Sequence, residues 1–394
     1  MSQNDPQKTK LGSDSLVAAL ALRPRRALSQ NVRKCPRREK IVIPAIFGVG
    51  YNIPMTGADF WRELLDDSLP ATRDVQVLRF SRRAMATNFE VMLPFGPTHN
   101  QLAAEAALDC IDELEDQLSV YRDHSEVSGL NATAVAGAVK VEPRLFDLLE
   151  FAAHITQQTQ GAFDIATGAL IKAWGFYKRE GRVPTPAERS AAMAKTGTRF
   201  LAFDRDQRTV RYLRPGLEIN LGGIGKGYAL DRAAELLAQD WRVESALLHG
   251  GTSSVRAIGT PPGQERGWPI ALKHPWDEQR RLGTIYLNGM ALGTSAATFQ
   301  HFEYNGRKLG HLLDPRIGWP AEGVEQISVM APSAAEADAL STAFFVLGVE
   351  PTARFCQTHP DVGVIFLPAG QDRPLTYNLT ARTFSPDISA ASVP

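Results

Sequence analysis

The chain has 394 residues, 44% of them hydrophobic, so it is long enough to bury a large core in one large domain or two moderate ones. Basic and acidic residues balance at 43 each, but residues 1–40 carry ten Lys and Arg against three acidic residues, which leaves the remainder mildly acidic and argues against an extended nucleic-acid surface. The three scattered cysteines predict neither a disulfide framework nor a zinc site, and no apolar run is long enough for a transmembrane span.

Residues 1–75 are interpreted as a basic leader and linker that is flexible in solution. Their basic residues precede the apolar run Ile41–Gly50, which is the order found in export signals, and Arg37-Arg38 fits a degenerate twin-arginine pattern. The run is short, contains Pro44 and begins far from Met1, and no clear cleavage site follows it. We therefore favour a cytoplasmic location.

The folded domain is predicted to span residues 76–372, followed by a loosely attached polar tail over 373–394. Residues 75–93 read as two strands, because apolar residues alternate near their end. Residues 98–121 and 143–158 each carry an apolar stripe typical of an amphipathic helix, and the polar residues 122–131 between them predict a loop. Because strands and helices mix without a regular βαβ rhythm, the sequence indicates the α+β class.

A glycine-rich stretch, Glu218–Asp231, leads from an apolar strand into a predicted helix. Glycines allow close approach of a ligand to the backbone, and a helix N-terminus favours phosphate, to which Lys226 would add positive charge. The spacing matches neither a P-loop nor the dinucleotide motif, and a purely structural turn is the alternative. A second glycine-rich turn, Leu248–Ser254, includes His249, a weaker candidate base than His311.

The loop His311–Gly318 and the helix that follows it carry the clearest chemistry. An X-Pro bond disfavours helix at Asp314, so we expect a loop there. Asp338 and Thr342 are four residues apart on a predicted helix, so their hard oxygen atoms share one face and suit Mg²⁺. With His311 as a base, the pattern favours metal-assisted phosphoryl chemistry. The alternatives are a hydrogen-bonding histidine and a solvated or capping Asp–Thr pair.

Seven short segments, taken in order, resemble the ApbE family of FAD:protein FMN transferases over roughly residues 78–370. They are Met85-Ala86-Thr87, Ser119-Val120-Tyr121 with Ser125-Glu126 and Asn131, Gly161–Asp164, Asn220–Asp231, Thr294-Ser295, His311–Gly318, and Ala337–Thr342 with Leu347-Gly348. Each segment is short, but the uninterrupted order is specific. The resemblance implies an ApbE-like (T-fold-like) fold of mixed sheets packed with helices, with the flavin site between the two halves.

The resemblance also assigns roles to matching positions. Tyr121 would stack on the isoalloxazine ring. The other FAD contacts would be Met85, Ala162, Phe163, Asp164, Asn220, Lys226 near the phosphates, and Leu312. Mg²⁺ would be held by Asp338, Thr342 and the carbonyl of Gly223, and His311 would deprotonate the acceptor hydroxyl. The implied reaction joins FMN through its phosphate to a Thr or Ser of a partner protein, such as a redox or electron-transport protein, and releases AMP. Export to the periplasm, common in this family, is the alternative location.

Four motifs differ from the family pattern. The usual Asp before Leu-Gly-Gly is Asn220, and the Gly of Met-Gly-Thr is Ala86. Gly-Gly-Asp becomes Gly250-Gly251-Thr252, and Thr-Ser-Gly-Asp becomes Thr294–Ala297. Because acidic positions are lost, the alternative function is a flavin-binding module without transferase activity, or an FAD pyrophosphatase.

Overall fold

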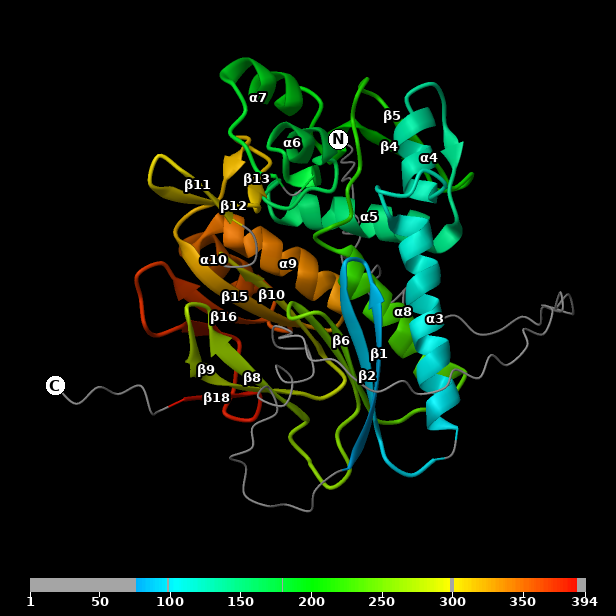
Figure 1. Cartoon of the computed structure of the whole chain (residues 1–394), viewed down its shortest axis with the longest axis vertical. Helices are drawn as coiled ribbons and strands as arrows, with labels where there is room; N and C mark the ends of the chain where they lie inside the picture. Colours follow the sequence, from blue (N-terminus) through cyan, green and yellow to red (C-terminus); the bar gives the residue numbers. More distant parts are fainter. Residues whose placement is uncertain (1–75, 98, 179, 298–300, 388–394) are drawn as a thin grey trace, which may run out of the picture. The chain divides into compact units, whose positions relative to one another are not determined.

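An eight-stranded antiparallel sheet runs through the described part of the chain (Figure 1). The computed structural model describes residues 76–387, without residues 98, 179 and 298–300. The strand order is β1-β2-β6-β7-β10-β15-β16-β17. Its strands are β1 (Val77–Ala84), β2 (Thr87–Pro94), β6 (Ala246–Gly250), β7 (Ser254–Ile258), β10 (Ala291–Ala296), β15 (Val324–Ala331), β16 (Gly363–Pro368) and β17 (Leu375–Tyr377).

Four smaller sheets accompany the large one. Two have three strands, in the orders β18-β9-β8 and β3-β5-β4, and two are hairpins, β11-β12 and β13-β14. Their strands are β3 (Val139–Lys140), β4 (Leu201–Asp204), β5 (Thr209–Tyr212), β8 (Trp268–His274), β9 (Asp277–Leu287), β11 (His301–Tyr304), β12 (Arg307–Gly310), β13 (Leu313–Asp314), β14 (Trp319–Pro320) and β18 (Phe384–Pro386).

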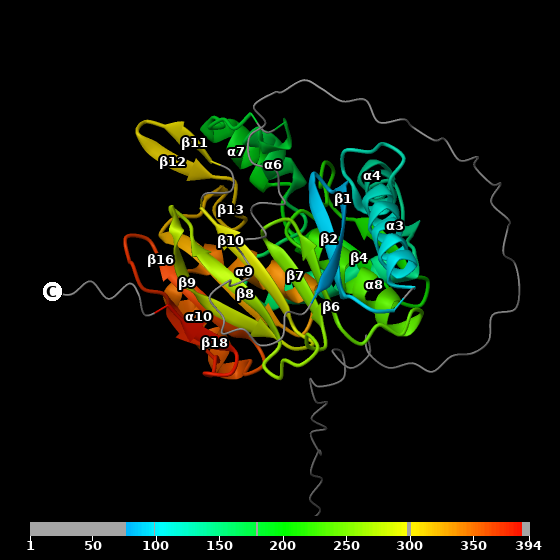
Figure 2. The same ribbon diagram turned by 60° about the horizontal axis from the view of Figure 1, so that its bottom comes forward.

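The helices lie largely on one side of the eight-stranded sheet, where α8 and α9 pack against it (Figures 1 and 2). They are α3 (Asn100–Leu118), α4 (Glu126–Thr133), α5 (Pro143–Gln158), α6 (Gly168–Ala173), α7 (Pro186–Met193), α8 (Gly225–Gln239), α9 (Ala334–Leu347) and α10 (Val349–Thr358), with short 3₁₀ turns at Phe176–Lys178 and Thr198–Phe200. No described helix combines the length and apolar character needed to cross a membrane.

The eight-stranded sheet is buried on both faces, and successive residues alternate between two cores, because side chains of a strand point to opposite sides. Val91 and Leu248 belong to the larger core under the helices. Their neighbours Met92 and Leu247 belong to a second core shared with β8, β9 and β18. A third, smaller core around Trp174 joins α6 and α7 to the β11–β14 region. This layering buries every residue of β6 and β16.

Most predicted elements of the first half are confirmed. The two expected strands are β1 and β2, and the two expected amphipathic helices are α3 and α5. The predicted loop over residues 122–131 is wrong in its second half, which forms α4. Ser125 explains the helix, since its side chain accepts a hydrogen bond from the Ser128 N–H as an N-cap.

The predicted loose tail is also wrong for the residues that the structure describes. Strand β17 pairs with β16 in the large sheet, and β18 pairs with β9 in the three-stranded sheet. The side chain of Phe384 is 7% exposed and packs in the second core. Polar composition concealed this attachment, because strand pairing is a backbone interaction that polar residues also make. The predicted leader over residues 1–75 lies outside the described residues.

Two glycines let α9 approach α8 and the sheet closely. A Cβ built at Gly227 on α8 would lie 2.0 Å from the Ala334 carbonyl oxygen, and one at Gly293 on β10 would lie 2.4 Å from the Ala337 carbonyl carbon. These contacts involve backbone, which cannot rotate away as a side chain can. Glycine at both positions therefore fixes where α9 sits.

We predict that Gly227→Ala lowers the free energy of unfolding by about 2 kcal/mol or more, because the backbones of α8 and α9 must separate. This is the upper part of the range for overpacked sites. Gly225→Ala, two residues earlier on α8, is the control, because a Cβ there would meet its nearest neighbour only at 3.8 Å. Urea unfolding measures both. Equal stability of the two variants would contradict the proposed close packing.

Candidate active site

The carboxylate of Asp338 lies where α9 meets the start of α8 and strand β7. Its Oδ2 accepts a hydrogen bond from the Gly227 N–H at 2.8 Å. The Ser254 hydroxyl lies 2.7 Å from Oδ1 and 3.0 Å from Oδ2. The Asp338 residue is only 6% exposed. Three segments far apart in sequence thus converge on one buried carboxylate.

Burial raises the pKa of Asp338 because the charged form loses its hydration, while the Lys226 charge and the two hydrogen bonds lower it. Lys226, the residue singled out in the glycine-rich stretch, therefore acts electrostatically on Asp338. A buried carboxylate is costly unless it is paired or binds a cation. The surroundings of Asp338 are thus suited to a positively charged ligand.

Thr342 and Gly223 lie side by side close to Asp338. Thr342 is one turn further along α9, and its hydroxyl donates to the Asp338 carbonyl at 3.2 Å. A Cβ built at Gly223 would lie 3.4 Å from Thr342 Oγ1 and 3.2 Å from the Phe163 ring. Only glycine leaves this space open beside the hydroxyl. The structure therefore brings Gly223 and Thr342 together and holds Asp338 on the same helix as Thr342.

The donor chemistry of these residues fits a hard divalent cation. The Asp338 carboxylate has about four lone-pair sites and accepts hydrogen bonds from two donors, the Gly227 N–H and the Ser254 hydroxyl, so it keeps capacity for a metal ion. Carboxylate, hydroxyl and carbonyl oxygens are the ligands that Mg²⁺ takes. Within the described residues no group of three His, Cys, Asp or Glu forms a metal site, and the predicted ligand set contains only one such side chain.

Asp231, which sequence reasoning left without a role, anchors the start of α9. Its two carboxylate oxygens accept hydrogen bonds from the Ala334 and Ala335 N–H groups at 2.8 and 2.9 Å. Arg256 on β7 approaches it at 3.3 Å. A carboxylate at a helix N-terminus is stabilising, and burial raises its pKa to about 6. Its two partners on α9 are more than one hundred residues away, so no local signal reveals them.

Tyr121 presents its ring at the surface, with the residue 61% exposed. Its ring centroid lies 4.7 Å from that of Tyr177, at an interplanar angle of 31°. The Tyr177 hydroxyl donates to the Val120 carbonyl at 2.9 Å, which fixes the second ring. Tyr177 was not identified from sequence, since its contact with Tyr121 is made only by the fold. The pair forms an aromatic platform suited to stacking.

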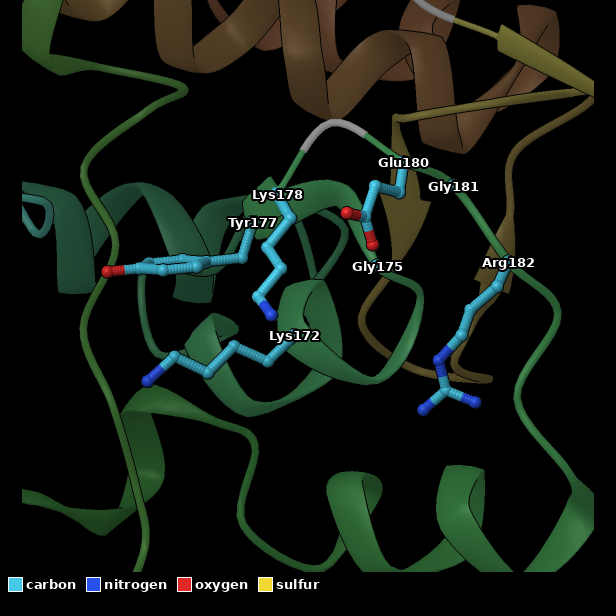
Figure 3. A pocket seen from close by; sticks show the side chains of 7 residues that line it. All are labelled: Lys172, Gly175, Tyr177, Lys178, Glu180, Gly181 and Arg182. Carbon is cyan, nitrogen blue, oxygen red and sulfur yellow. The ribbon is translucent and has the colours of Figure 1, made fainter.

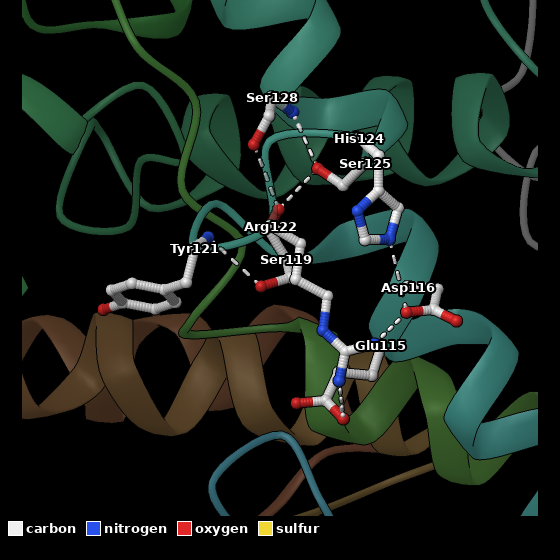
Figure 4. Close-up of polar contacts among 8 residues, drawn as sticks. All are labelled: Glu115, Asp116, Ser119, Tyr121, Arg122, His124, Ser125 and Ser128. Atoms are coloured by element: carbon white, nitrogen blue, oxygen red, sulfur yellow. Dashed lines mark hydrogen bonds and ion pairs between the residues drawn. The ribbon is translucent and has the colours of Figure 1, made fainter.

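The loop that carries Tyr121 is tied to the end of α3 (Figure 4). Arg122 pairs with Glu115 at 2.8 Å and also with Asp116. The Tyr121 N–H donates to Ser119 Oγ at 3.1 Å. These contacts hold the backbone on either side of the exposed ring, so the Tyr121 ring is positioned before any ligand arrives.

Two cavities border Tyr177. The smaller, of about 280 Å³, is lined by polar groups that include Asn131 and Asn220. The larger, of about 580 Å³, lies around Lys172 and Lys178 (Figure 3). Lys172 and Tyr177 line both cavities. The smaller cavity thus reaches Asn220, and both cavities touch Tyr177, the ring against which Tyr121 packs. Tyr121 and Asn220 are both predicted to contact the flavin.

Asn220 has a clear structural role. Its side-chain oxygen accepts from the Gly222 N–H at 2.8 Å, and its own N–H donates to the Ile165 carbonyl at 2.7 Å. An amide oxygen makes the same turn contact as a carboxylate oxygen. The change from Asp to Asn therefore preserves the glycine-rich turn that presents Gly223.

The segment Ala162–Asp164 is buried in this structure. Ala162 and Phe163 are 1% and 2% exposed. The Asp164 carboxylate accepts from the Ala166 and Thr198 N–H groups, and burial raises its pKa. The Phe163 ring instead packs against Gly223, so the segment supports the glycine-rich turn that contains Gly223. Its contact with flavin stays a prediction.

The turn between β1 and β2 carries Met85 and Ala86, both with positive φ, at 47° and 62°. Two successive positive φ values define the type I′ turn that suits a tight hairpin. Met85 packs against the main core. Next to the hairpin, a Cβ at Gly251 would lie 2.4 Å from Thr87 Oγ1, so the turn after β6 closes onto this hairpin.

His311 directly follows β12, two residues before β13, and is half-buried. Leu312 packs against the main core, and its carbonyl accepts from the Ala321 N–H at 2.8 Å. Arg316 donates to both carboxylate oxygens of Asp314, at 2.9 and 2.7 Å, and its side chain lies beside Gly161. The loop is therefore held next to the Gly161 segment. By contrast, His249 is buried on β6 and its pKa is lowered to about 3, which makes it a poor base at neutral pH.

The comparisons with known proteins agree with this geometry. The ApbE family model matches residues 85–366. The FAD:protein FMN transferase of Klebsiella pneumoniae (strain 342) is 31% identical over 277 residues, which cover 70% of this chain and 85% of that protein. The chain belongs to the ApbE family of transferases, and the family resemblance and α+β class predicted from sequence are confirmed.

Solved structures support the same fold. The ApbE protein of Thermotoga maritima superposes with a TM-score of 0.70 at 29% identity, covering 76% of this chain and 96% of that one. The apo form of the flavinyl transferase ApbE of Pseudomonas stutzeri gives a TM-score of 0.67 at 28% identity, covering 76% of this chain and 94% of that one.

We predict that Ala86→Gly raises the free energy of unfolding by about 0.5–1 kcal/mol. A positive φ costs an L-residue about 1–2 kcal/mol, which glycine avoids. Glycine loses more conformational entropy on folding than alanine does, and this loss offsets part of the gain. Ala191→Gly, on the exposed face of α7, is the control and should be destabilising by about 1 kcal/mol. Thermal unfolding of both variants compares them. A destabilised Ala86→Gly protein would show that the turn is not strained.

Proposed function

We propose that this chain is a Mg²⁺-dependent FAD:protein FMN transferase that attaches FMN through its phosphate to a Thr or Ser hydroxyl of a partner protein and releases AMP. The observation that supports this most is the buried Asp338 carboxylate beside Lys226, with Thr342 and Gly223 adjacent to each other. Family membership supports the same reaction, since curated relatives carry that name.

In the proposed reaction the acceptor oxygen attacks the phosphorus on the FMN side of the diphosphate. The bond from that phosphorus to the bridging oxygen breaks, and AMP leaves with the electron pair. Asp338, Thr342 and the Gly223 carbonyl would hold Mg²⁺, which when bound supplies positive charge to the diphosphate. Lys226 adds a second positive charge at the start of α8, where N–H groups also favour anions.

His311 is proposed to accept the proton of the acceptor hydroxyl, since an alcohol is a weak nucleophile and imidazole titrates near neutral pH. Tyr121, backed by Tyr177, would stack on the isoalloxazine ring and orient the flavin. The Arg316–Asp314 pair would hold the His311 loop rigid. In this scheme His311 moves one proton, Tyr121 orients the flavin, and the Arg316–Asp314 pair orients the loop.

Two alternatives of a different class follow from the lost acidic positions. A flavin-binding module would bind FAD without releasing AMP, and a pyrophosphatase would release AMP with water as the acceptor. Incubation with FAD, Mg²⁺ and a candidate acceptor distinguishes them. The proposed function predicts AMP together with acceptor whose mass has increased by one FMN. AMP without modified acceptor indicates a hydrolase, and bound FAD with neither product indicates a binding module.

We predict that His311→Ala retains FAD binding but loses acceptor modification by about 10²–10⁴-fold, the usual contribution of a general base. His154→Ala, on the exposed face of α5, is the matched control and should transfer FMN normally. Mass spectrometry of the acceptor and fluorescence titration of FAD measure the two properties. Undiminished transfer by His311→Ala would remove this residue from the base role.

We predict that Asp338→Ala lowers transfer by at least about 10²-fold, the loss typical when one group that stabilises developing charge is removed. The remaining activity should no longer respond to Mg²⁺ or to its removal by chelator. Asp147→Ala, exposed on α5, is the control. An Asp338→Ala protein that turns over normally with the same Mg²⁺ requirement would refute the ligand assignment.

A further inference from the structure

Ser254, which was assigned no role from sequence, contacts the Asp338 carboxylate directly. Its hydroxyl lies within hydrogen-bond distance of both carboxylate oxygens, at 2.7 and 3.0 Å. The Ser254 residue is 0% exposed. We propose that Ser254 is a positioning residue that orients Asp338 for the divalent cation, an inference that rests on the proposed function.

The hydrogen bond blocks rotation of the carboxylate without using up its ligand capacity. A serine hydroxyl has one proton, which is shared between Oδ1 and Oδ2. The Gly227 N–H holds Oδ2 from the opposite element, α8. The carboxylate is therefore fixed between β7 and α8, while lone pairs remain for a cation. Groups that orient a ligand in this way typically alter metal affinity by about 10–100-fold.

The backbone is arranged to make this contact. In the sheet, Ser254 pairs with Gly293 of β10. At Gly293 a Cβ would lie 2.6 Å from the Asp338 N, so the helix and the sheet approach each other closely at this one point. That approach brings Asp338 within reach of a strand residue. A larger residue at Gly293 would move α9 away and break the Ser254 contact.

A chain of hydroxyls leads outward from this contact. Ser253 Oγ lies 3.2 Å from Ser254 Oγ, and Ser253 is half-buried directly before β7. Ser254 thus has an acceptor, Asp338, on one side and a second hydroxyl on the other. This network favours one orientation of the Ser254 hydroxyl, in which its proton points at the carboxylate. No charged group takes part in it besides Asp338.

The test is cation binding by the full chain without FAD, with Mn²⁺ as the probe and electron paramagnetic resonance as the readout. Ser254→Ala should weaken Mn²⁺ binding about 10–100-fold. In the transferase assay, the Mg²⁺ concentration for half-maximal rate should rise by a similar factor, while the rate at saturating Mg²⁺ falls less than about threefold. Activity and metal binding are thus measured separately.

Ser328→Ala is the matched control. Ser328 is also 0% exposed on a strand of the same sheet, but its hydroxyl pairs with Thr294 Oγ at 2.9 Å and not with a carboxylate. It should bind Mn²⁺ as the unaltered chain does. Ser254→Cys keeps the side-chain size with a weaker donor, so we expect an intermediate affinity. If Ser254→Ala fails to fold, the Cys variant carries the test.

Unchanged Mn²⁺ affinity in a folded Ser254→Ala protein would overturn the inference, as would failure of both variants to fold, since the hydroxyl would then serve folding alone. Failure of the proposed function gives a different pattern, in which the unaltered chain binds no Mn²⁺ or Asp338→Ala binds it equally well. If Asp338→Ala abolishes binding and Ser254→Ala has no effect, only the role of Ser254 is wrong.

Discussion

The site depends on one buried negative charge. Asp338 would be costly at its position without compensation, because a carboxylate loses its hydration there. The Gly227 N–H, the Ser254 hydroxyl and the Lys226 charge offset part of that cost. An apolar residue would pack more simply between helix and sheet, so retention of a carboxylate indicates use of its charge. Functional sites are where proteins hold such perturbed groups.

The close packing of α9 follows from the same requirement. Glycines at residues 227 and 293 remove the side chains that would separate the backbones, and Asp231 holds the first turn of α9 through two N–H groups. Two of the positions that differ from the family pattern keep the local backbone geometry. Asn220 still caps the glycine-rich turn, and Ala86 still forms a hairpin turn. Asp338, Thr342 and Gly223, the residues proposed to hold Mg²⁺, are present together with the packing that places them.

Sequence reasoning found what depends on local periodicity. Helices α3 and α5 follow from apolar spacing, α9 follows from its helix-favouring composition, and the hairpin β1–β2 follows from alternation. It did not find α4, because this helix has few apolar residues and so little periodicity. It also did not find the strands after residue 373, because their pairing is made by the backbone. Asp338 was identified from its spacing to Thr342. Ser254, Asp231 and Tyr177 were not, because each acts through a partner brought near only by the fold.

The most direct test of the central claim is a crystal structure of the chain with FAD and Mn²⁺, with the metal located by its anomalous scattering. The account predicts one anomalous peak about 2.0–2.3 Å from an Asp338 carboxylate oxygen, Thr342 Oγ1 and the Gly223 carbonyl oxygen, beside the diphosphate. A peak elsewhere, or a diphosphate bound with no metal against Asp338, would contradict it.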